Sequence, residues 1–203
     1  SPNDTQVLIK VMAAAFNAAD YRMMQMGLFR KKKIFGADIS GIVESVGSKV
    51  TKFKVGDEVL VDLSRDGFGG FAQYAVASEK MVALKPPALT FEQAAAIPMS
   101  AVTALQALKK GKIAKGKKIL IIGCSGGVGL FALQLAKYYG AQVTGVCSTK
   151  NMELAKNLGA HHLINYQKED FTKSNEKHDF VLVVNGNNSM SKLKKLLNLG
   201  GVC

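Results

Sequence analysis

The sequence predicts an α/β protein in which a mostly-β segment precedes a parallel sheet covered by helices. Short β-branched segments separated by glycines occupy the first half, and strand and helix patterns alternate in the second half. Within the second half, a glycine-rich turn near residue 123 joins a buried strand to a helix. With 203 residues, 48% of them apolar, the chain can bury the core that this fold needs.

Composition excludes several classes of protein. Twenty glycines and four prolines without a periodic repeat exclude collagen, coiled coil and low-complexity chains. The three cysteines have no C-x-x-C spacing, which argues against a disulfide framework or zinc ribbon and favours a reducing setting. No uninterrupted apolar run reaches the length of a membrane span, and the opening residues do not resemble a signal peptide. We therefore expect a cytoplasmic protein.

The net charge leaves the partner open. Twenty-seven Lys and Arg against 15 Asp and Glu give +12, which suits a phosphorylated ligand, nucleic acid or an acidic membrane surface. The lysines are scattered, with one cluster at residues 30–33 that most simply forms a solvated loop. An anionic partner for that cluster is the alternative.

The first half predicts short strands punctuated by glycine turns. β-Branched and apolar residues favour strands at residues 7–11, 39–46, 58–61 and 71–76. Strands this short, separated by turns, are typical of a largely antiparallel or barrel-like domain.

From residue 85 onward the pattern alternates between helix and strand. Thr90 and Gln93 predict a capped helix that Pro98 ends. Further helices are expected at residues 100–110, 128–139, 151–158 and 189–199, and strands at 118–122, 142–147, 163–164 and 180–184. This alternation predicts a parallel sheet of four strands covered by helices.

The segment 118–136 carries the strongest functional signal. A buried strand runs into Gly123-Cys-Ser-Gly126-Gly127-Val-Gly129, which opens a helix. Glycines let the backbone turn sharply and let a pyrophosphate approach the N–H groups at the helix N-terminus. Cys124 stands where the usual G-x-G-x-x-G pattern has a glycine, but the strand and helix supply the context that the pattern requires. The segment therefore predicts dinucleotide binding, a merely structural turn being the alternative.

The next strand indicates which dinucleotide. NAD-binding sites place an acidic residue about 20 residues after the turn, where it binds the adenine ribose. This chain has no Asp or Glu from Cys124 to Met152, and the strand ends in Ser148-Thr149-Lys150. Hydroxyls and a lysine favour a 2′-phosphate, so NADP(H) is the expected cofactor. Alternatively, Lys150 only begins a solvated helix.

Five collinear segments carry a resemblance to a known family. These are GADISGIVESVGSKVTKFKVGDEV (36–59), GFGGFAQY (67–74), AAAIPMSAVTALQAL (94–108), KILIIGCSGGVGLFALQLAK (118–137) and LGAHHLINYQKEDF (158–171). They resemble the medium-chain dehydrogenase/reductase superfamily, and within it the zinc-independent quinone oxidoreductase branch that includes zeta-crystallin.

The resemblance implies a GroES-like catalytic domain at residues 1–89, a Rossmann NADP-binding domain at 90–203 and an active site between them. It implies that the pyrophosphate lies on Ser125, Gly126, Gly127 and Val128. Thr103 would lie near the nicotinamide-side phosphate or ribose, and Val184 and Asn185 near the ribose or nicotinamide. The 2′-phosphate would be held by Ser148, Lys150 and Tyr166.

The resemblance also suggests how the substrate side is built. Asn17-Ala-Ala-Asp20-Tyr21 resembles the family's Asn-x-x-Asp motif beside the substrate cleft. Asn17 would hydrogen-bond the oxygen that gains charge, Tyr21 would border the pocket and Asp20 would hold the loop. A purely structural role for all three is the alternative. Metal-dependent relatives have a cysteine near Asn17 and Gly-His-Glu near Gly36-Ala-Asp38, so no zinc is expected.

The resulting functional prediction is an NADPH-dependent reductase of quinones or α,β-unsaturated carbonyls, a homodimer in its full-length form. The resemblance implies that both ends of the chain are short, and we expect the 203 residues alone to be catalytically impaired. The alternatives are a zinc-free alcohol or enoyl-thioester oxidoreductase and a non-catalytic dinucleotide- or RNA-binding relative. Attachment to an acidic membrane through residues 30–33 remains compatible with an enzyme.

Overall fold

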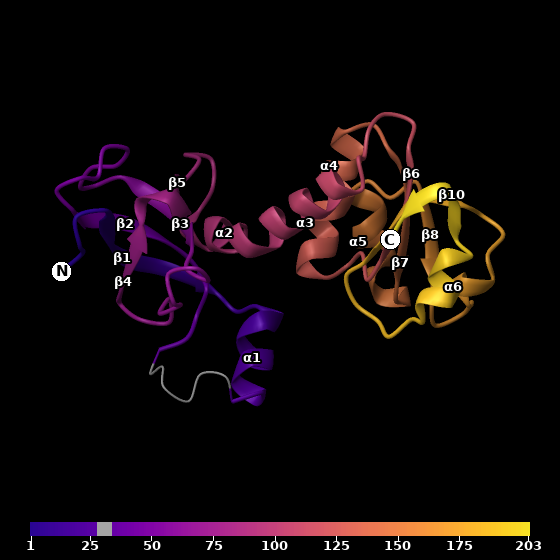
Figure 1. Ribbon diagram of the computed structural model, residues 1–203, viewed down its shortest axis with the longest axis horizontal. Coiled ribbons are helices and arrows are strands. Elements are labelled where there is room, and N and C mark those ends of the chain that lie inside the picture. The colour runs from indigo at the N-terminus through magenta and orange to yellow at the C-terminus, as the bar shows by residue number, and fades with distance from the viewer. Residues whose placement is uncertain (28–33) are drawn as a thin grey trace. The chain divides into compact units, whose positions relative to one another are not determined.

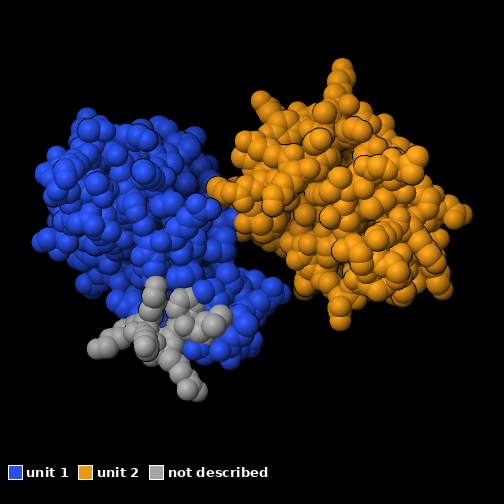
Figure 2. Space-filling model, in the orientation of Figure 1, with its two compact units in different colours: residues 1–99 blue, residues 100–203 orange. Residues whose placement is uncertain are grey.

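The computed structural model describes residues 1–27 and 34–203, and the basic cluster predicted at residues 30–33 lies outside them. The chain forms two compact units, residues 1–99 and residues 100–203 (Figures 1 and 2). Each unit has its own sheet and its own core. The predicted functional division at residues 89 and 90 stays a prediction.

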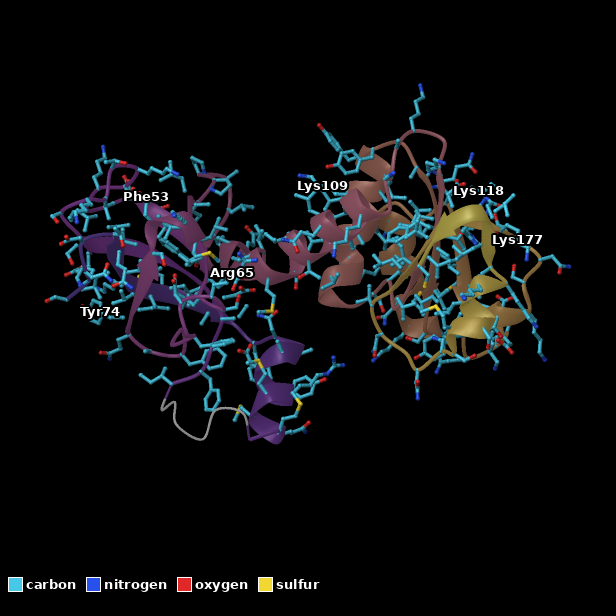
Figure 3. The ribbon with its side chains drawn as sticks, viewed as in Figure 1. Phe53, Arg65, Tyr74, Lys109, Lys118 and Lys177 are labelled. Carbon is cyan, nitrogen blue, oxygen red and sulfur yellow. The ribbon has the colours of Figure 1, made fainter. Side chains whose placement is uncertain are left out.

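The first unit is built on an antiparallel sheet, as the sequence predicts. Its strand order is β4-β1-β2-β3-β5. The strands are β1 Gln6–Ala15, β2 Asp38–Val46, β3 Glu58–Asp62, β4 Tyr74–Ser78 and β5 Val82–Leu84. One face is buried by alternating residues such as Val7 and Ile9, which are inaccessible to solvent. Phe53, labelled in Figure 3, packs against this core.

Two details of this unit differ from the prediction. The strand expected at 71–76 begins at Tyr74, because the Phe71 N–H bonds to the Phe35 carbonyl instead of joining the ladder. Helix α1, Ala18–Gln25, was not predicted, since its residues lack an apolar stripe at helical spacing. The remaining short elements are η1 Glu79–Met81, a 3₁₀ turn, and α2 Phe91–Ala95.

Pro98 begins a helix and does not merely end one. Thr90 and Gln93 cap α2 as expected, with the Gln93 N–H donating to Thr90 Oγ1 over 3.2 Å. The next helix, α3, runs Pro98–Lys110. A proline suits the first position of a helix, because its missing N–H would have no partner there and its φ is already helical. The helix expected from Ser100 therefore starts two residues earlier.

The second unit is a five-stranded parallel sheet with the order β10-β9-β6-β7-β8. Its strands are β6 Lys118–Ile122, β7 Gln142–Cys147, β8 His162–Asn165, β9 His178–Val183 and β10 Leu197–Val202. Besides part of α3 it contains α4 Gly127–Tyr138, η2 Thr149–Asn151, α5 Met152–Asn157, η3 Phe171–Lys173 and α6 Met190–Lys194. This is the doubly wound order of a Rossmann fold.

Alternate residues of the central strand pack against opposite helical layers. Ile119 and Ile121 lie in a core with residues of α3, α4 and α5. Leu120 and Ile122 lie in a second core with Leu193 of α6 and with Leu196. A strand buried on both faces needs apolar residues at successive positions, which explains the continuous apolar run that the sequence has at residues 118–122.

The end of the chain corrects the prediction of a helix over residues 189–199. Helix α6 covers only Met190–Lys194, and β10 follows as a fifth strand parallel to β9. The predicted fourth strand is consequently not the edge of the sheet. Leu193, Leu196 and Leu197 allow a helical spacing, but the ladder bonds available beside β9 favour an extended chain from Leu197.

The amino ends of β6 and β9 carry charged side chains. Lys118 is labelled in Figure 3. Its N–H donates to Asp179 Oδ2 over 2.8 Å, and its Nζ lies 3.6 Å from a Glu176 carboxylate oxygen. These partly exposed pairs contribute little to stability. Within residues 1–27 and 34–203, no helix combines the length and apolar composition needed to cross a membrane.

Replacement of Leu196 tests the observed packing beneath the C-terminal strand. Leu196 is fully buried and Leu199 is fully exposed. We expect Leu196→Ala to lower the free energy of unfolding by about 2–4 kcal/mol, because it leaves a cavity, and Leu199→Ala to change it by less than about 0.5 kcal/mol. Urea denaturation of both variants measures the difference. Equal effects would contradict this packing.

Candidate functional site

The carboxyl edge of the parallel sheet gathers most of the predicted cofactor residues. Parallel strands end at a common edge, and ligands of doubly wound sheets bind there. Ser125 and Gly126 follow β6, Ser148 follows β7, Tyr166 follows β8 and Asn185 follows β9. Residues far apart in the sequence are thus brought to one edge by strand topology alone.

The glycine turn is packed too tightly for a side chain at several of its positions. A Cβ atom on Gly129 would lie 2.4 Å from the Gly123 carbonyl oxygen, and one on Gly127 would lie 2.9 Å from Ser100 Oγ. Gly123 has φ +80°, a conformation that favours glycine. The turn therefore needs glycine at 123 for its backbone conformation and at 129 for lack of space, whether or not a ligand binds.

Gly126 differs from these glycines because no described residue crowds it. A Cβ there would meet only the Gly123 oxygen, at 3.6 Å, and Gly126 is exposed. It is the N-cap of α4 and has no side chain to bond the free N–H groups of the first turn. The open space and free donors form a cradle that fits a phosphate group.

A polar network connects the turn to the end of β7. Asn151 Nδ2 donates to Ser125 Oγ over 3.0 Å and to Ser148 Oγ over 3.2 Å. The sequence did not single out Asn151, although its position in the polar run after β7 was a usable signal. Ser125 and Ser148, predicted separately, are therefore joined by one amide.

A second set of amides orders the segment that carries Lys150. Thr149 N–H and Oγ1 both donate to Gln167 Oε1, over 3.0 and 3.1 Å, and Asn165 Nδ2 donates to Thr149 Oγ1 over 2.7 Å. Lys150 itself is exposed in η2. The ends of β7 and β8 are thereby held together beneath an exposed cation.

A cavity of about 420 Å³ opens beside the turn. Its lining combines aromatic, aliphatic and amide groups, from Ile122, Gly123, Val146, Tyr166, Phe171, Asn185, Gly186, Asn187 and Asn188. It includes Tyr166 and Asn185 among the predicted residues. Val184 instead packs partly against the core, and Val128 is half-buried there. Thr103 is exposed on α3 and does not line this cavity.

In the first unit, Asn17 is held by two acidic residues. Its backbone N–H donates to Asp20 Oδ2 over 2.7 Å, and its side-chain Nδ2 donates to Asp38 Oδ2 over 3.1 Å. Both carboxylates are buried, with Asp20 1% and Asp38 0% exposed. Tyr21 lies at the surface and stacks on Phe16 with ring centroids 6.3 Å apart. The three predicted residues thus lie in one place, and Asp38 joins them.

Burial dominates the electrostatics of Asp38. Desolvation raises its pKa to about 7, and the negative charges of Asp62 and Asp20 act in the same direction. Hydrogen bonds from the Met99 N–H and from Asn17 oppose this rise. A carboxyl group whose pKa lies near neutrality can hold a proton at physiological pH.

The residues at the position where metal-dependent relatives have zinc ligands do not fit a catalytic zinc site. Asn17 and Asp38 supply an amide and one carboxylate, without cysteine or histidine. In the described part of the chain, no group of three or more His, Cys, Asp or Glu side chains is arranged to hold a metal ion. Cys124 and Cys147 are buried, and desolvation raises the pKa of Cys124 to about 12, which disfavours a thiolate ligand.

Comparison with known proteins places this geometry in a family. Residues 3–87 match the alcohol dehydrogenase GroES-like domain, and residues 127–203 match the family model described as zinc-binding dehydrogenase. A quinone oxidoreductase structure from Coxiella burnetii aligns with TM-score 0.90 and 34% identity, over 100% of this chain and 67% of that one. The chain belongs to the medium-chain dehydrogenase/reductase superfamily, in its quinone oxidoreductase branch.

Two plant relatives of this superfamily member are more similar in sequence. A 2-methylene-furan-3-one reductase of Solanum lycopersicum is 42% identical over 191 residues, 88% of this chain and 49% of that protein. A chloroplastic NADPH-dependent alkenal/one oxidoreductase of Arabidopsis thaliana is 38% identical over 211 residues, 98% of this chain and 54% of that protein. The chain therefore spans about half the length of these curated relatives.

The two kinds of glycine in the turn predict different effects on the stability of this superfamily member. Gly129→Ala should lower the free energy of unfolding by about 1–3 kcal/mol, because its methyl group would overlap backbone atoms of the turn. Gly126→Ala should cost less than about 1 kcal/mol, since its backbone conformation and surroundings accept a methyl group. Chemical denaturation measures both. Equal losses would show that the contact at Gly129 has been misassigned.

The raised pKa of Asp38 predicts how stability depends on pH. Its ordinary value is 3.8 and its folded value about 7, so the folded state binds its proton more tightly than the unfolded state. The stabilisation is complete below about pH 4 and is lost as the pH rises toward 7. Asp38→Asn should remove this contribution to the pH dependence of the free energy of unfolding. Between pH 4.5 and 8 the stability of the variant should therefore rise relative to that of wild type.

Denaturant titrations of wild type, Asp38→Asn and Asp62→Asn at both pH values provide the measurement and its control. Asp62 lies opposite Asp38 in the β2–β3 ladder and is half-buried. Its replacement should retain most of the slope. A slope that is unchanged in Asp38→Asn would refute the assignment.

Proposed function

We propose that the protein transfers hydride from NADPH to a quinone or an α,β-unsaturated carbonyl without a metal ion. The observation that carries the proposal is the open N-terminus of α4 at Gly126, next to a β7 end with hydroxyl and amide groups and an exposed lysine. The names of the tomato and Arabidopsis relatives support the same substrate class and cofactor.

The preference for NADPH rests on charge. In an NAD site a carboxylate accepts hydrogen bonds from the ribose hydroxyls, and the same carboxylate would repel a 2′-phosphate. Here Ser148 and Asn151 occupy the end of β7, and Lys150 stands exposed beside them. We assign Ser148, Lys150 and Tyr166 to the 2′-phosphate, because hydroxyls and an ammonium group are its natural donors.

The remaining cofactor residues follow the carboxyl edge. Ser125, Gly126, Gly127 and Val128 would hold the pyrophosphate at the start of α4. Asn185, and Val184 before it, would contact the ribose or nicotinamide end, as would Thr103 of α3. In this assignment residues 90–203 form the NADP-binding domain, and residues 1–89 form the catalytic domain.

When bound, NADPH supplies the hydride, so the chain's own residues need only position the acceptor and stabilise its charge. Negative charge develops on the oxygen of a quinone or enone as it is reduced. The Asn17 amide would donate a hydrogen bond to that oxygen, and such a preorganised donor favours the transition state. Tyr21 would border the acceptor, and Asp20 would fix the backbone of Asn17.

The proposal includes three further properties. The enzyme would be independent of zinc, because its donor set at the expected position is unsuited to the metal. It would act in the cytoplasm and as a homodimer. Fractionation and light scattering would test the last two properties.

Paired titrations with NADPH and NADH, followed by fluorescence, test the cofactor assignment. We expect wild type to bind NADPH more tightly, and Lys150→Ala to weaken NADPH binding by about tenfold while leaving NADH binding unchanged. Lys156→Ala on α5 is the charge-matched control and should change neither. Gly126→Ala should weaken the binding of both dinucleotides, because its methyl group would occupy the phosphate cradle.

The outcome separates the possibilities. Equal affinity for the two dinucleotides, or an equal effect of Lys150→Ala and Lys156→Ala, would overturn the NADPH assignment. Where NADPH binds, oxidation of NADPH with a series of quinones and enones tests the reaction. Because the 203 residues alone are expected to be impaired, the reaction is assayed in the full-length form, where absence of turnover with every acceptor would reject the proposed activity.

A further inference from the structure

Asp38 is a buried carboxylate that neither the cofactor assignment nor the family motif explains. It accepts the Met99 N–H at both oxygens, over 3.1 Å to Oδ1 and 3.0 Å to Oδ2, and it accepts Asn17 Nδ2 at Oδ2. It lies at the start of β2 and is inaccessible to solvent. Asp38 therefore cannot contact a substrate directly, but it touches the side chain proposed to do so.

The contact orients the Asn17 amide. A carboxylate only accepts hydrogen bonds, so the amide nitrogen must face Asp38. The Asn17 backbone is fixed separately, by its N–H bond to Asp20 and by the Asp20 N–H bond to the Asn17 carbonyl, 3.0 Å long. Backbone and side chain are thus held from two sides. The amide nitrogen carries two hydrogens, and within residues 1–27 and 34–203 its hydrogen bond to Asp38 uses one of them, which leaves the other for an acceptor oxygen.

The surroundings of Asp38 make its ionised form unfavourable for the stability of the fold. Asp62 stands opposite it on β3, Asp20 approaches from α1, and both are acidic. The ion pairs found among the described residues do not include Asp38. Asp20 Oδ1 is also buried, and it has no hydrogen-bond partner among the residues that the structure describes. An unpaired buried charge destabilises a fold, so stability alone does not account for a carboxyl group at this position.

We propose that Asp38 is a positioning residue that holds the Asn17 amide with one N–H directed toward the substrate oxygen. This inference rests on the proposed function, in which Asn17 contacts that oxygen. The titratable groups facing Asp38 are Asp62 and Asp20, and its neutral partners are Asn17 and Met99. Protonation of Asp38 turns it into a donor, which can bond the amide oxygen instead, so the orientation of Asn17 follows pH.

Side-chain amide signals of Asn17 in ¹⁵N NMR spectra test the positioning without any substrate. The Asn17 signals are assigned by their loss in Asn17→Ala. In wild type they should shift with pH through the titration of Asp38, and in Asp38→Asn they should move to new positions that no longer depend on pH. In Asp62→Asn the titration should persist at a lower pH, because a neighbouring negative charge is removed. Asn17 signals that are identical in wild type and Asp38→Asn would overturn the proposal.

A double-mutant cycle on the reaction tests the consequence. Asp38→Asn should lower kcat by about tenfold, with the dissociation constant of NADPH unchanged, and should remove the inflection of the kcat–pH profile near neutrality. A residue that acts through Asn17 has no further effect once Asn17 is gone. Asn17→Ala and the double variant should therefore have the same kcat. Additive losses, or a weakened affinity for NADPH, would indicate a general structural role and reject the proposal.

The two measurements separate this inference from the proposed function. If the full-length wild type reduces no acceptor but the Asn17 signals depend on Asp38, the reaction is wrong and the positioning stands. If wild type is active and its Asn17 amide signals are the same as those of Asp38→Asn, the positioning is wrong and the reaction stands. Thermal unfolding of each variant at pH 6 shows whether a loss reflects an unfolded protein.

Discussion

The second unit depends on the contact between Gly129 and the carbonyl of Gly123. The helix backbone approaches the turn so closely that a single methyl group would overlap it. This approach seats α4 against β6, and the buried residues of α4 then complete the core beside β7. It also leaves the N-cap residue Gly126 and Gly127 exposed, with no side chain that caps the first turn of α4. Packing and anion binding therefore follow from one close contact.

The first unit is organised around a polar interaction instead. Asp38 connects the beginning of β2 to Asn17, before α1, and to Met99, near the beginning of α3. It meets these groups in the absence of water, where hydrogen bonds are strong and an unpaired carboxylate is costly. Such an arrangement is worth retaining where a side chain must be held in one orientation. Asn17, which the family motif singles out, is the side chain so held.

Elements with a strong apolar periodicity, or with glycine and proline residues that mark their ends, were predictable. The apolar run at 118–122, the glycine turn and the alternation after residue 85 led to the observed sheet and helices, and the antiparallel character of the first sheet was also expected. Helix α1 and strand β10 were missed or misassigned. Both are short, and both have partners distant in sequence: the N-cap of α1, Asn17, is held by Asp38 at the start of β2, and β10 forms its ladder with β9. Local propensity is too weak to decide such segments.

By itself, the sequence determined the two-part α/β architecture, the dinucleotide turn and the absence of an acidic residue where NAD would need one. These properties depend on residue type and on spacing along the chain. Tertiary structure alone decided that Asn151 joins Ser125 to Ser148, that Asn185 and Tyr166 share one cavity, and that Asp38 binds Asn17. Those groups are separated by up to 26 residues. Only strand order and burial bring them together, and burial also sets the pKa of Asp38.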